Sequence, residues 1–366
     1  LYNVNGKRKV LPFFVENIDD KFYISSAYHS AFIMGAELLQ IDTFKIEQLY
    51  QYALDLSLAE GNSTSAKKEV ACEYIGIVYN LLSMSFKKPK SAIVKMVSPN
   101  GDTLLTNIDF SASWRYFLAG LFSEQEDEVH YSFDEKNNGI LVVESFQPLS
   151  LAVFKRKIDA FFEEVQAKNC TSVYIDLRNN LGGLLRAEEY LFSYINTKQT
   201  AIKTNYLYKR SDYDRFAQLS PVQQMQFENR AKSVYPNGLI SKEYDFYKLP
   251  KGATYTILYD YIPENNRNYV YMGDCHLVLN GNSMSASVLF AAWFKHIDRG
   301  SILGSACMGG MGGTFGNPAI ISLSNSKIDV MVATLKFTPL HIRERTLAAI
   351  APDITIKATR EDLMEQ

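Results

Sequence analysis

The sequence has few cysteines, no long apolar run and no excess of charge of either sign. Its four cysteines lie far apart and form no C-x-x-C pair, which argues against a disulfide framework or a metal site of closely spaced ligands (Cys72, Cys170, Cys275, Cys307). No stretch reaches the roughly 18 consecutive apolar residues of a membrane-spanning helix. Lys and Arg number 38 against 40 Asp and Glu, a net charge of −2. This near balance disfavours a nucleic-acid partner.

The composition that remains is that of a folded globular protein. Apolar residues make up 47% of the 366 positions and charged residues 21%, which argues against a disordered chain. At about 150 residues per domain, the length predicts two or three domains. The chain starts at Leu1 and not at Met, which we interpret as the removal or omission of a preceding segment.

The sequence pattern of residues 1–130 predicts a small mixed α+β module. Apolar residues at helical or alternating spacing indicate its elements. We expect extended runs at Val10–Val15, Lys21–Ser25 and Ala36–Ile41, helices at Ile46–Ser57 and Lys67–Leu82, and a hairpin of Ala92–Val97 with Thr103–Ile108. The acidic segment Ser123–Glu128 is the candidate boundary with the next domain.

Residues 131–366 show strands that alternate with helices, which predicts a largely parallel or mixed sheet covered by helices. The expected strands are Gly139–Ser145, Ser172–Leu177, His276–Asn280 and Ser301–Ser305, and the expected helices are Leu151–Gln166, Leu184–Ile195 and Ser285–His296. A tyrosine-rich insertion at about residues 200–270 is expected to be partly helical. It is either a lid or substrate-binding segment, or an ordinary surface excursion.

Two polar turns follow predicted strands and precede predicted helices. In the first, Asp176–Gly183, two glycines allow backbone N–H groups to approach an anion or a developing oxyanion at a helix N-terminus. In the second, Asn280–Ser287, Ser285 stands at the helix start, as in a nucleophile elbow. The simpler alternatives are an ordinary strand–helix turn and a helix-capping serine. Because ligands bind outside the carboxyl ends of the strands in open α/β sheets, we expect both turns to face one crevice.

These residues carry a family resemblance. The run IDLRNNLGG, then SASVLFAAWFKH and ILGSACMGGMGG, with the closing Ala351–Ile354, resembles the tail-specific (C-terminal-processing) serine peptidase family over about residues 138–357. The segment Gly35–Ile41 is similar to the PDZ-like domain that precedes the protease core in that family. The resemblance implies an α+β fold of two domains, a PDZ-like module with a helical insertion followed by an α/β protease core.

The resemblance also implies site residues. Ser285 falls on the nucleophile, and the N–H groups of Gly182, Gly183 and Ala286 would form the oxyanion hole. Gly310 stands where the bacterial processing branch has a lysine base, so the chain is closer to the tricorn-like branch, which uses a histidine upstream of the PDZ-like domain. That base is expected before Leu1 or is lost. Glu344 is a possible supporting acid, two residues off the family spacing.

The five histidines offer no clear base within the chain. His276 and His296 are too far along their elements to reach Ser285, since a helix rises about 1.5 Å per residue. His29 and His130 are interpreted as surface or structural residues, and His341 stays open.

No cofactor is expected, because the loop Gly309–Gly313 lacks the Gly-Lys-Ser/Thr ending of a phosphate-binding loop. A carbohydrate-active hydrolase would need two carboxylates converging on a cleft. The acidic pairs Glu163–Glu164 and Glu188–Glu189 lie on helices with apolar faces, and we expect them to be solvated.

The resulting hypothesis is a serine-type endopeptidase that acts on peptide or protein substrates through an acyl-enzyme on Ser285. The alternative is an inactive pseudo-peptidase that binds extended peptides on a strand edge. The resemblance implies an exported bacterial protein, periplasmic, secreted or lipid-anchored. The sequence leaves the oligomeric state and the cleavage specificity open.

Overall fold

The computed structural model describes residues 9–11, 13–27, 31–57, 59–84, 90–110, 112–113, 128–209, 250–325, 329–340 and 348–364. His29, His341, Glu344 and residues 210–249 of the tyrosine-rich insertion lie outside the described residues, as do residues 123–127 of the candidate boundary. Buried apolar side chains form two large clusters, one before residue 111 and one after residue 128. We refer to the N-terminal part (described residues 9–113) and the C-terminal part (from residue 128).

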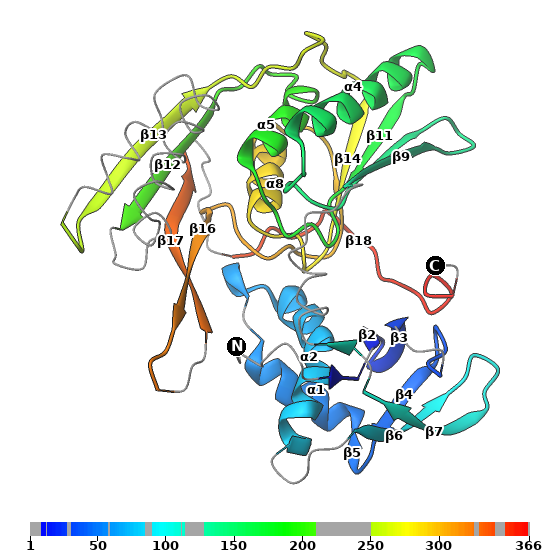
Figure 1. Cartoon of the computed structure of the whole chain (residues 1–366). Helices are drawn as coiled ribbons and strands as arrows, with labels where there is room; N and C mark the ends of the chain where they lie inside the picture. Colours follow the sequence, from blue (N-terminus) through cyan, green and yellow to red (C-terminus); the bar gives the residue numbers. More distant parts are fainter. Residues whose placement is uncertain are drawn as a thin grey trace.

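The N-terminal part is an antiparallel sheet packed against two helices (Figure 1). Its sheet order is β2-β3-β4-β6-β7, with β2 (Phe13–Ile18), β3 (Lys21–Ala27), β4 (Glu37–Ile41), β6 (Ser91–Val97) and β7 (Thr103–Asp109); β5 (Phe44–Lys45) pairs with β4, and β1 (Lys9–Val10) pairs with β8 (Ala112–Ser113). The predicted hairpin is confirmed, with Val97 opposite Thr103. Alternate residues of β6 are buried, as expected for a strand with one inward face.

Two helices cover this sheet. Helix α1 (Ile46–Leu56) buries Ile46, Leu49 and Ala53, a spacing that places them on one helical face. Helix α2 (Thr64–Met84) starts three residues before the predicted start at Lys67, after the short 3₁₀ helix η1 (Glu60–Asn62). Both predicted helices are therefore present, and α2 is the longer of the two.

The C-terminal part contains a six-stranded sheet in the order β18-β15-β14-β11-β10-β9. The strands are β9 (Val129–Phe133), β10 (Gly139–Val143), β11 (Ser172–Asp176), β14 (Asp274–Leu279), β15 (Ile302–Gly304) and β18 (Ile354–Thr355). All neighbouring pairs are parallel except β9 with β10. The intervening helices are α4 (Leu151–Ala167), α5 (Leu185–Ser193) and α8 (Ala286–His296). The predicted strand–helix alternation is confirmed, whereas the antiparallel edge strand β9 was not predicted.

A second, four-stranded sheet was not foreseen. It has the order β13-β12-β17-β16 and consists of β12 (Ile202–Lys209), β13 (Thr254–Tyr261), β16 (Thr314–Ser322) and β17 (Asp329–Pro339). The expectation of a partly helical insertion is wrong for its described ends, which are strands. Ile202, Thr204, Tyr206 and Tyr208 are buried at every second position, and Tyr, Thr and Ile favour strands.

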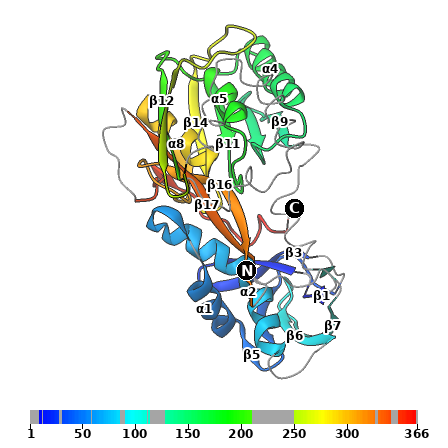
Figure 2. The ribbon, with the colours of Figure 1, turned by 60° about the vertical axis from the view of Figure 1, so that its left-hand side comes forward.

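The two sheets enclose α5 and α8. Figure 1 shows both helices between the four-stranded sheet and the six-stranded sheet. On one side Leu289 of α8 packs with Tyr206, Leu335 and Phe337 of the four-stranded sheet. On the other side the buried residues of α5 and α8 join the main cluster with those of the six-stranded sheet. The carboxyl ends of β11, β14 and β15 lie toward the helices of the N-terminal part (Figures 1 and 2).

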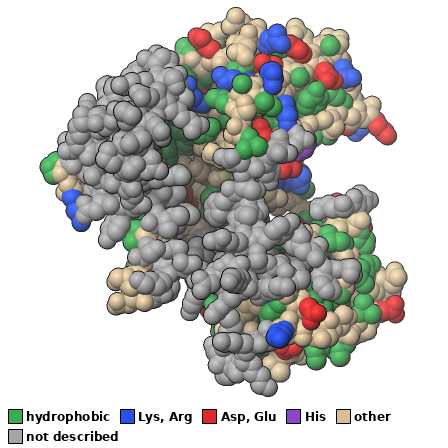
Figure 3. All heavy atoms as spheres, viewed as in Figure 1, with side chains coloured by type: hydrophobic (Ala, Val, Ile, Leu, Met, Phe, Trp, Pro, Cys, Tyr) green, Lys and Arg blue, Asp and Glu red, His purple; other side chains and the backbone are tan. Residues whose placement is uncertain are grey.

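The surface of the C-terminal part carries charges of both signs. In the view of Figure 3, Lys and Arg side chains are interspersed with Asp and Glu side chains over its described face. Among the described helices, none is long and apolar enough to cross a bilayer.

Glu188 and Glu189 correct one expectation, because both are buried on α5 and not solvated. Their exposed fractions are 2% and 7%. Burial, with Glu189 nearby, raises the pKa of Glu188 well above its ordinary value of 4.5. Burial also raises the pKa of Glu189 to about 7. The four-stranded sheet covers this face of α5, and the sequence of the helix alone gave no sign of that second cover.

A pH dependence of stability follows from these two carboxyls. The pKa values of Glu188 and Glu189 are higher in the folded protein than in the unfolded chain. As pH rises, the two carboxyls therefore lose their protons first in the unfolded chain, which stabilises the unfolded state. The free energy of unfolding is expected to fall between about pH 5 and pH 8. Glu188→Gln removes one titrating group and is expected to flatten that fall. Urea denaturation at several pH values measures the effect, with the exposed Glu163→Gln on α4 as the control. An unchanged slope in Glu188→Gln would contradict the assignment.

Candidate active site

Two turns meet at the carboxyl edge of the six-stranded sheet. The glycine turn (residues 177–184) follows β11, and the nucleophile turn (residues 280–285) follows the neighbouring parallel strand β14. Asn179 N–H donates to Asn280 Oδ1 at 2.9 Å, and Asn280 Nδ2 donates back to Asn179 Oδ1 at 2.8 Å. Met284 N–H donates to the carbonyl of Asn180 at 3.0 Å. Both turns therefore lie at the same edge of the sheet, as the predicted shared crevice requires.

Ser285 has an unusual backbone conformation at the start of α8. Its φ of 56° and ψ of −114° lie outside the extended region that helix-capping residues adopt. Its side chain makes no capping hydrogen bond, so the alternative of a helix-capping serine is wrong. A non-glycine residue at positive φ costs about 1–3 kcal/mol, and such strain clusters at functional sites. Strained strand-to-helix turns that expose a serine hydroxyl are typical of nucleophile elbows.

The glycine turn lies directly against Ser285. A Cβ atom at Gly182 would stand 2.6 Å from Ser285 Cβ and 2.9 Å from the Ala286 nitrogen. The Gly182 N–H donates to Asn180 Oδ1 at 2.8 Å. Among the described residues, the N–H groups of Gly183 and Ala286 have no hydrogen-bond acceptor. Of the three expected oxyanion donors, Gly183 and Ala286 are thus available, whereas the Gly182 N–H already has an acceptor.

Asn180 supports both turns, a role that the sequence did not reveal. It is fully buried, and its Nδ2 donates to the carbonyl of Val143 at 2.8 Å. Its own carbonyl accepts from Ser287 Oγ at 3.0 Å as well as from Met284 N–H. The one signal in the sequence was that Asn180 is the second asparagine of the Asn-Asn-x-Gly-Gly run. Asparagine is common in turns, so a single sequence does not distinguish this supporting role from an ordinary turn residue.

Asn180→Ala is expected to destabilise the fold. It leaves the buried Val143 carbonyl and the Gly182 N–H without their partners, and each unsatisfied buried group costs about 1–3 kcal/mol. Urea denaturation measures the loss. A loss below about 0.5 kcal/mol, the usual range of a neutral surface substitution, would show that the Asn180 side chain does not hold the turn.

The glycine-rich loop borders the nucleophile turn. Met308 N–H donates to the carbonyl of Ser283 at 2.9 Å, and Met308 pairs with Met284 in a short parallel bridge. Gly310 pairs with Gly313 and with Ala349. The described part of the chain contains no group of three or more His, Cys, Asp or Glu side chains that could hold a metal ion.

The three described histidines lie away from the two turns. His130 is on the edge strand β9 and faces Glu144, with Nε2 3.6 Å from Oε1. His276 stacks on Tyr174 and lies three residues, about 10 Å, before the end of β14. His296 is the last residue of α8, about 15 Å along the helix from its start. None of these three lies at the carboxyl edge where Ser285 stands.

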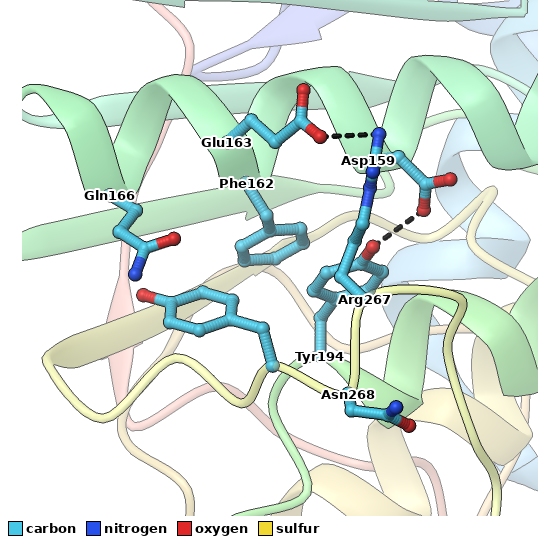
Figure 4. A pocket seen from close by; sticks show the side chains of 8 residues that line it. Asp159, Phe162, Glu163, Gln166, Tyr194, Arg267 and Asn268 are labelled. Carbon is cyan, nitrogen blue, oxygen red and sulfur yellow. Dashed lines mark hydrogen bonds and ion pairs between the residues drawn. The ribbon is translucent and has the colours of Figure 1, made fainter.

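A pocket of about 310 Å³ lies between α4 and residues 267–269 (Figure 4). Tyr194 Oη donates to Asp159 Oδ1 at 2.5 Å, and Arg267 pairs with Glu163. Tyr194 follows the last residue of α5, whereas Gly183 precedes the first. The pocket is therefore at the opposite end of α5 from Ser285 and is separate from the two turns.

Comparison with family models shows the class of protein to which the chain belongs. The model of a family described as peptidase family S41 matches residues 137–356, more than half of the chain. The chain therefore belongs to peptidase family S41. Among curated protein sequences, none matches it at a significant level.

Solved structures of similar fold include mature CPAF in complex with lactacystin. That structure is 15% identical, with a TM-score of 0.60, and covers 98% of this chain and 80% of its own. Mature CPAF is 14% identical, with a TM-score of 0.59, covering 97% of this chain and 79% of its own. A putative S41 protease from Bacteroides fragilis is 10% identical, with a TM-score of 0.45, covering 99% and 82%. At such identities the likeness to CPAF concerns the fold.

Proposed function

We propose that this chain hydrolyses peptide bonds in peptides or proteins through an acyl-enzyme on Ser285. The observation that carries the proposal is the backbone of Ser285, held at a φ of 56° without any capping role. A strained serine at the carboxyl edge of a parallel sheet, with no hydroxyl hydrogen bond to any described residue, fits a nucleophile better than a structural residue.

In this proposal Ser285 Oγ attacks the carbonyl carbon of the scissile peptide. A general base takes the Oγ proton and passes it to the leaving amine, and water then hydrolyses the acyl ester. The N–H groups of Gly183 and Ala286 receive the oxyanion, at the positive N-terminal end of α8. We place a histidine base outside the described residues, since His130, His276 and His296 lie away from Ser285. Glu344 stays a candidate for its supporting acid.

We also propose that the N-terminal part is PDZ-like and binds an extended stretch of the substrate. Its sheet ends in the edge strands β2 and β7, and an edge strand can receive a peptide by backbone hydrogen bonding. Family membership supports a role in processing protein C-termini and a location outside the cytoplasm. These finer assignments rest on the family and not on the geometry.

Labelling with a fluorophosphonate probe tests the proposal. The probe reacts with activated serines, and mass spectrometry locates the modified residue. We expect a label on Ser285 in the full native product and none in Ser285→Ala. Labelling only in a product longer than this sequence would place the base in the added residues. Both the chain of this sequence and the longer native product are treated with the probe. If neither takes the label, the catalytic proposal is contradicted and the peptide-binding alternative is favoured, since no described histidine lies beside Ser285.

A further inference from the structure

Helix α2 of the N-terminal part lies against the nucleophile turn. A Cβ atom at Gly281 would stand 2.5 Å from Ala66 Cα, so the turn packs directly on the helix backbone. Ala66 and Val70 of α2 form a buried cluster with Met308, against which Met284 packs. Figures 1 and 2 show the helices of the N-terminal part facing the C-terminal part. The nucleophile turn is thus in contact with a helix more than 200 positions away in sequence.

Two carboxylates of α2 bind this turn. Glu69 Oε1 accepts from Gly281 N–H at 2.9 Å and from Ser305 Oγ at 3.1 Å. Glu73 Oε1 accepts from Asn282 Nδ2 at 2.8 Å. Because the two glutamates are four residues apart on a helix, both side chains project from the same face. Each carboxylate therefore binds a residue within four positions of Ser285.

The contact reaches the glycine turn as well. Asn282 Nδ2 also lies 3.4 Å from Asn179 Oδ1, so Glu73, Asn282 and Asn179 form a chain of hydrogen bonds. Glu69 and Glu73 are both half-buried, and this burial raises the pKa of Glu73 to about 7 and that of Glu69 above its ordinary value. An acceptor removed from such a place leaves its donors unsatisfied.

We infer that Glu69 and Glu73 are positioning residues that hold the nucleophile turn in its strained form. They accept hydrogen bonds across the interface between the two parts of the chain, and Ser285 is reactive only while α2 is seated. This inference rests on the proposed role of Ser285. It assigns to the N-terminal part a direct role in catalytic geometry, besides any role in binding substrate.

The test compares two substitutions at each glutamate. Glu69→Leu removes the acceptor and keeps the volume; because it leaves the Gly281 N–H and the Ser305 hydroxyl without that acceptor, circular dichroism first establishes that the variant is folded. Glu69→Gln keeps an acceptor oxygen and serves as the conservative rescue. Glu73→Leu and Glu73→Gln form a second pair. Glu47→Leu, at an exposed position of α1, is the matched control.

The first readout is the rate of fluorophosphonate labelling at Ser285, which needs no bound peptide. We expect Glu69→Leu to label more than about 10-fold more slowly than the parent, because small misplacement of a reacting group costs up to about 100-fold. The labelling rate of Glu69→Gln should stay within about 3-fold of the parent rate, because the glutamine oxygen still accepts a hydrogen bond with a net worth of about 1 kcal/mol. The control Glu47→Leu should also stay within about 3-fold, because position 47 is exposed on α1. Equal rates for the parent and Glu69→Leu, or Glu69→Gln as slow as Glu69→Leu, would overturn the inference.

The second readout does not depend on activity. Hydrogen exchange, followed by mass spectrometry on peptides that contain Gly281, reports the bond from its N–H to Glu69. We expect faster exchange in Glu69→Leu and unchanged exchange in Glu47→Leu. If the parent itself takes no label, the proposed function fails, and the exchange result alone decides whether Glu69 holds the turn. Unchanged exchange in Glu69→Leu would overturn the inference.

Discussion

Gly182→Ala is expected to lower kcat/KM by about 10²–10³, since a small displacement of a nucleophile or of an oxyanion donor has effects of that size. The added methyl group would stand 2.6 Å from Ser285 Cβ and 2.9 Å from the Ala286 nitrogen. These distances are too short for any side-chain carbon, so the turn that carries Ser285 must move. Peptidase assays, together with the labelling rate at Ser285, measure the loss.

Gly101→Ala is the matched control. Gly182 and Gly101 have nearly the same φ, +92° and +91°, but a Cβ at Gly101, in the turn between β6 and β7, meets nothing within 4 Å. Both substitutions carry the cost of a non-glycine residue at positive φ, about 1 kcal/mol or more. Only Gly182→Ala adds the steric displacement of Ser285. Equal activity of the two variants, both folded by circular dichroism, would show that the glycine turn does not set the position of Ser285.

Replacing Ser285 is expected to have the largest effect on activity. Ser285→Ala and Ser285→Gly should both lose on the order of 10⁶ in kcat, as when the nucleophile of a serine protease is removed. Their stabilities should differ, because glycine adopts a φ of 56° without steric cost.

The stability comparison separates nucleophile from backbone strain. Glycine relieves about 1–3 kcal/mol of backbone strain at this position. Its greater flexibility in the unfolded chain costs about 0.5–1 kcal/mol. We therefore expect Ser285→Gly to be more stable than Ser285→Ala by about 1 kcal/mol. Urea denaturation of the two inactive variants gives the difference. A Ser285→Gly variant less stable than Ser285→Ala would mean that this backbone position is not strained, and the observation behind the proposed function would be lost.

Much of the C-terminal part could be predicted because its signals are local. Apolar residues at helical spacing set α4 and α5, and β-rich runs set β10, β11 and β14, each within a few residues of the predicted bounds. The polar residues after β11 and β14 marked both turns, since Asn and Gly favour turns wherever they occur. The position of Ser285 at the start of a helix also followed from the sequence.

The four-stranded sheet could not be predicted from such local signals. Its strands come from four segments between residues 202 and 339, and the pairing of β12 with β17 joins residues more than 120 positions apart. A short alternating run gives a strand but no partner, because register depends on which faces are buried together. Glu188 and Glu189 were misjudged for the same reason, since α5 is covered on a side that its own sequence marks as polar.

The sequence by itself determined the alternation of β10, β11, β14 and β15 with α4, α5 and α8, the two polar turns, and the serine at the head of α8. These depend on periodicity and turn chemistry within about ten residues. Only the tertiary structure decided the strained φ of Ser285, the contact of Gly182 with it, and the bonds from Glu69 and Glu73. The physical reason is distance along the chain: packing brings residues together that are about 100 to 210 positions apart, and no local preference encodes which of them will meet.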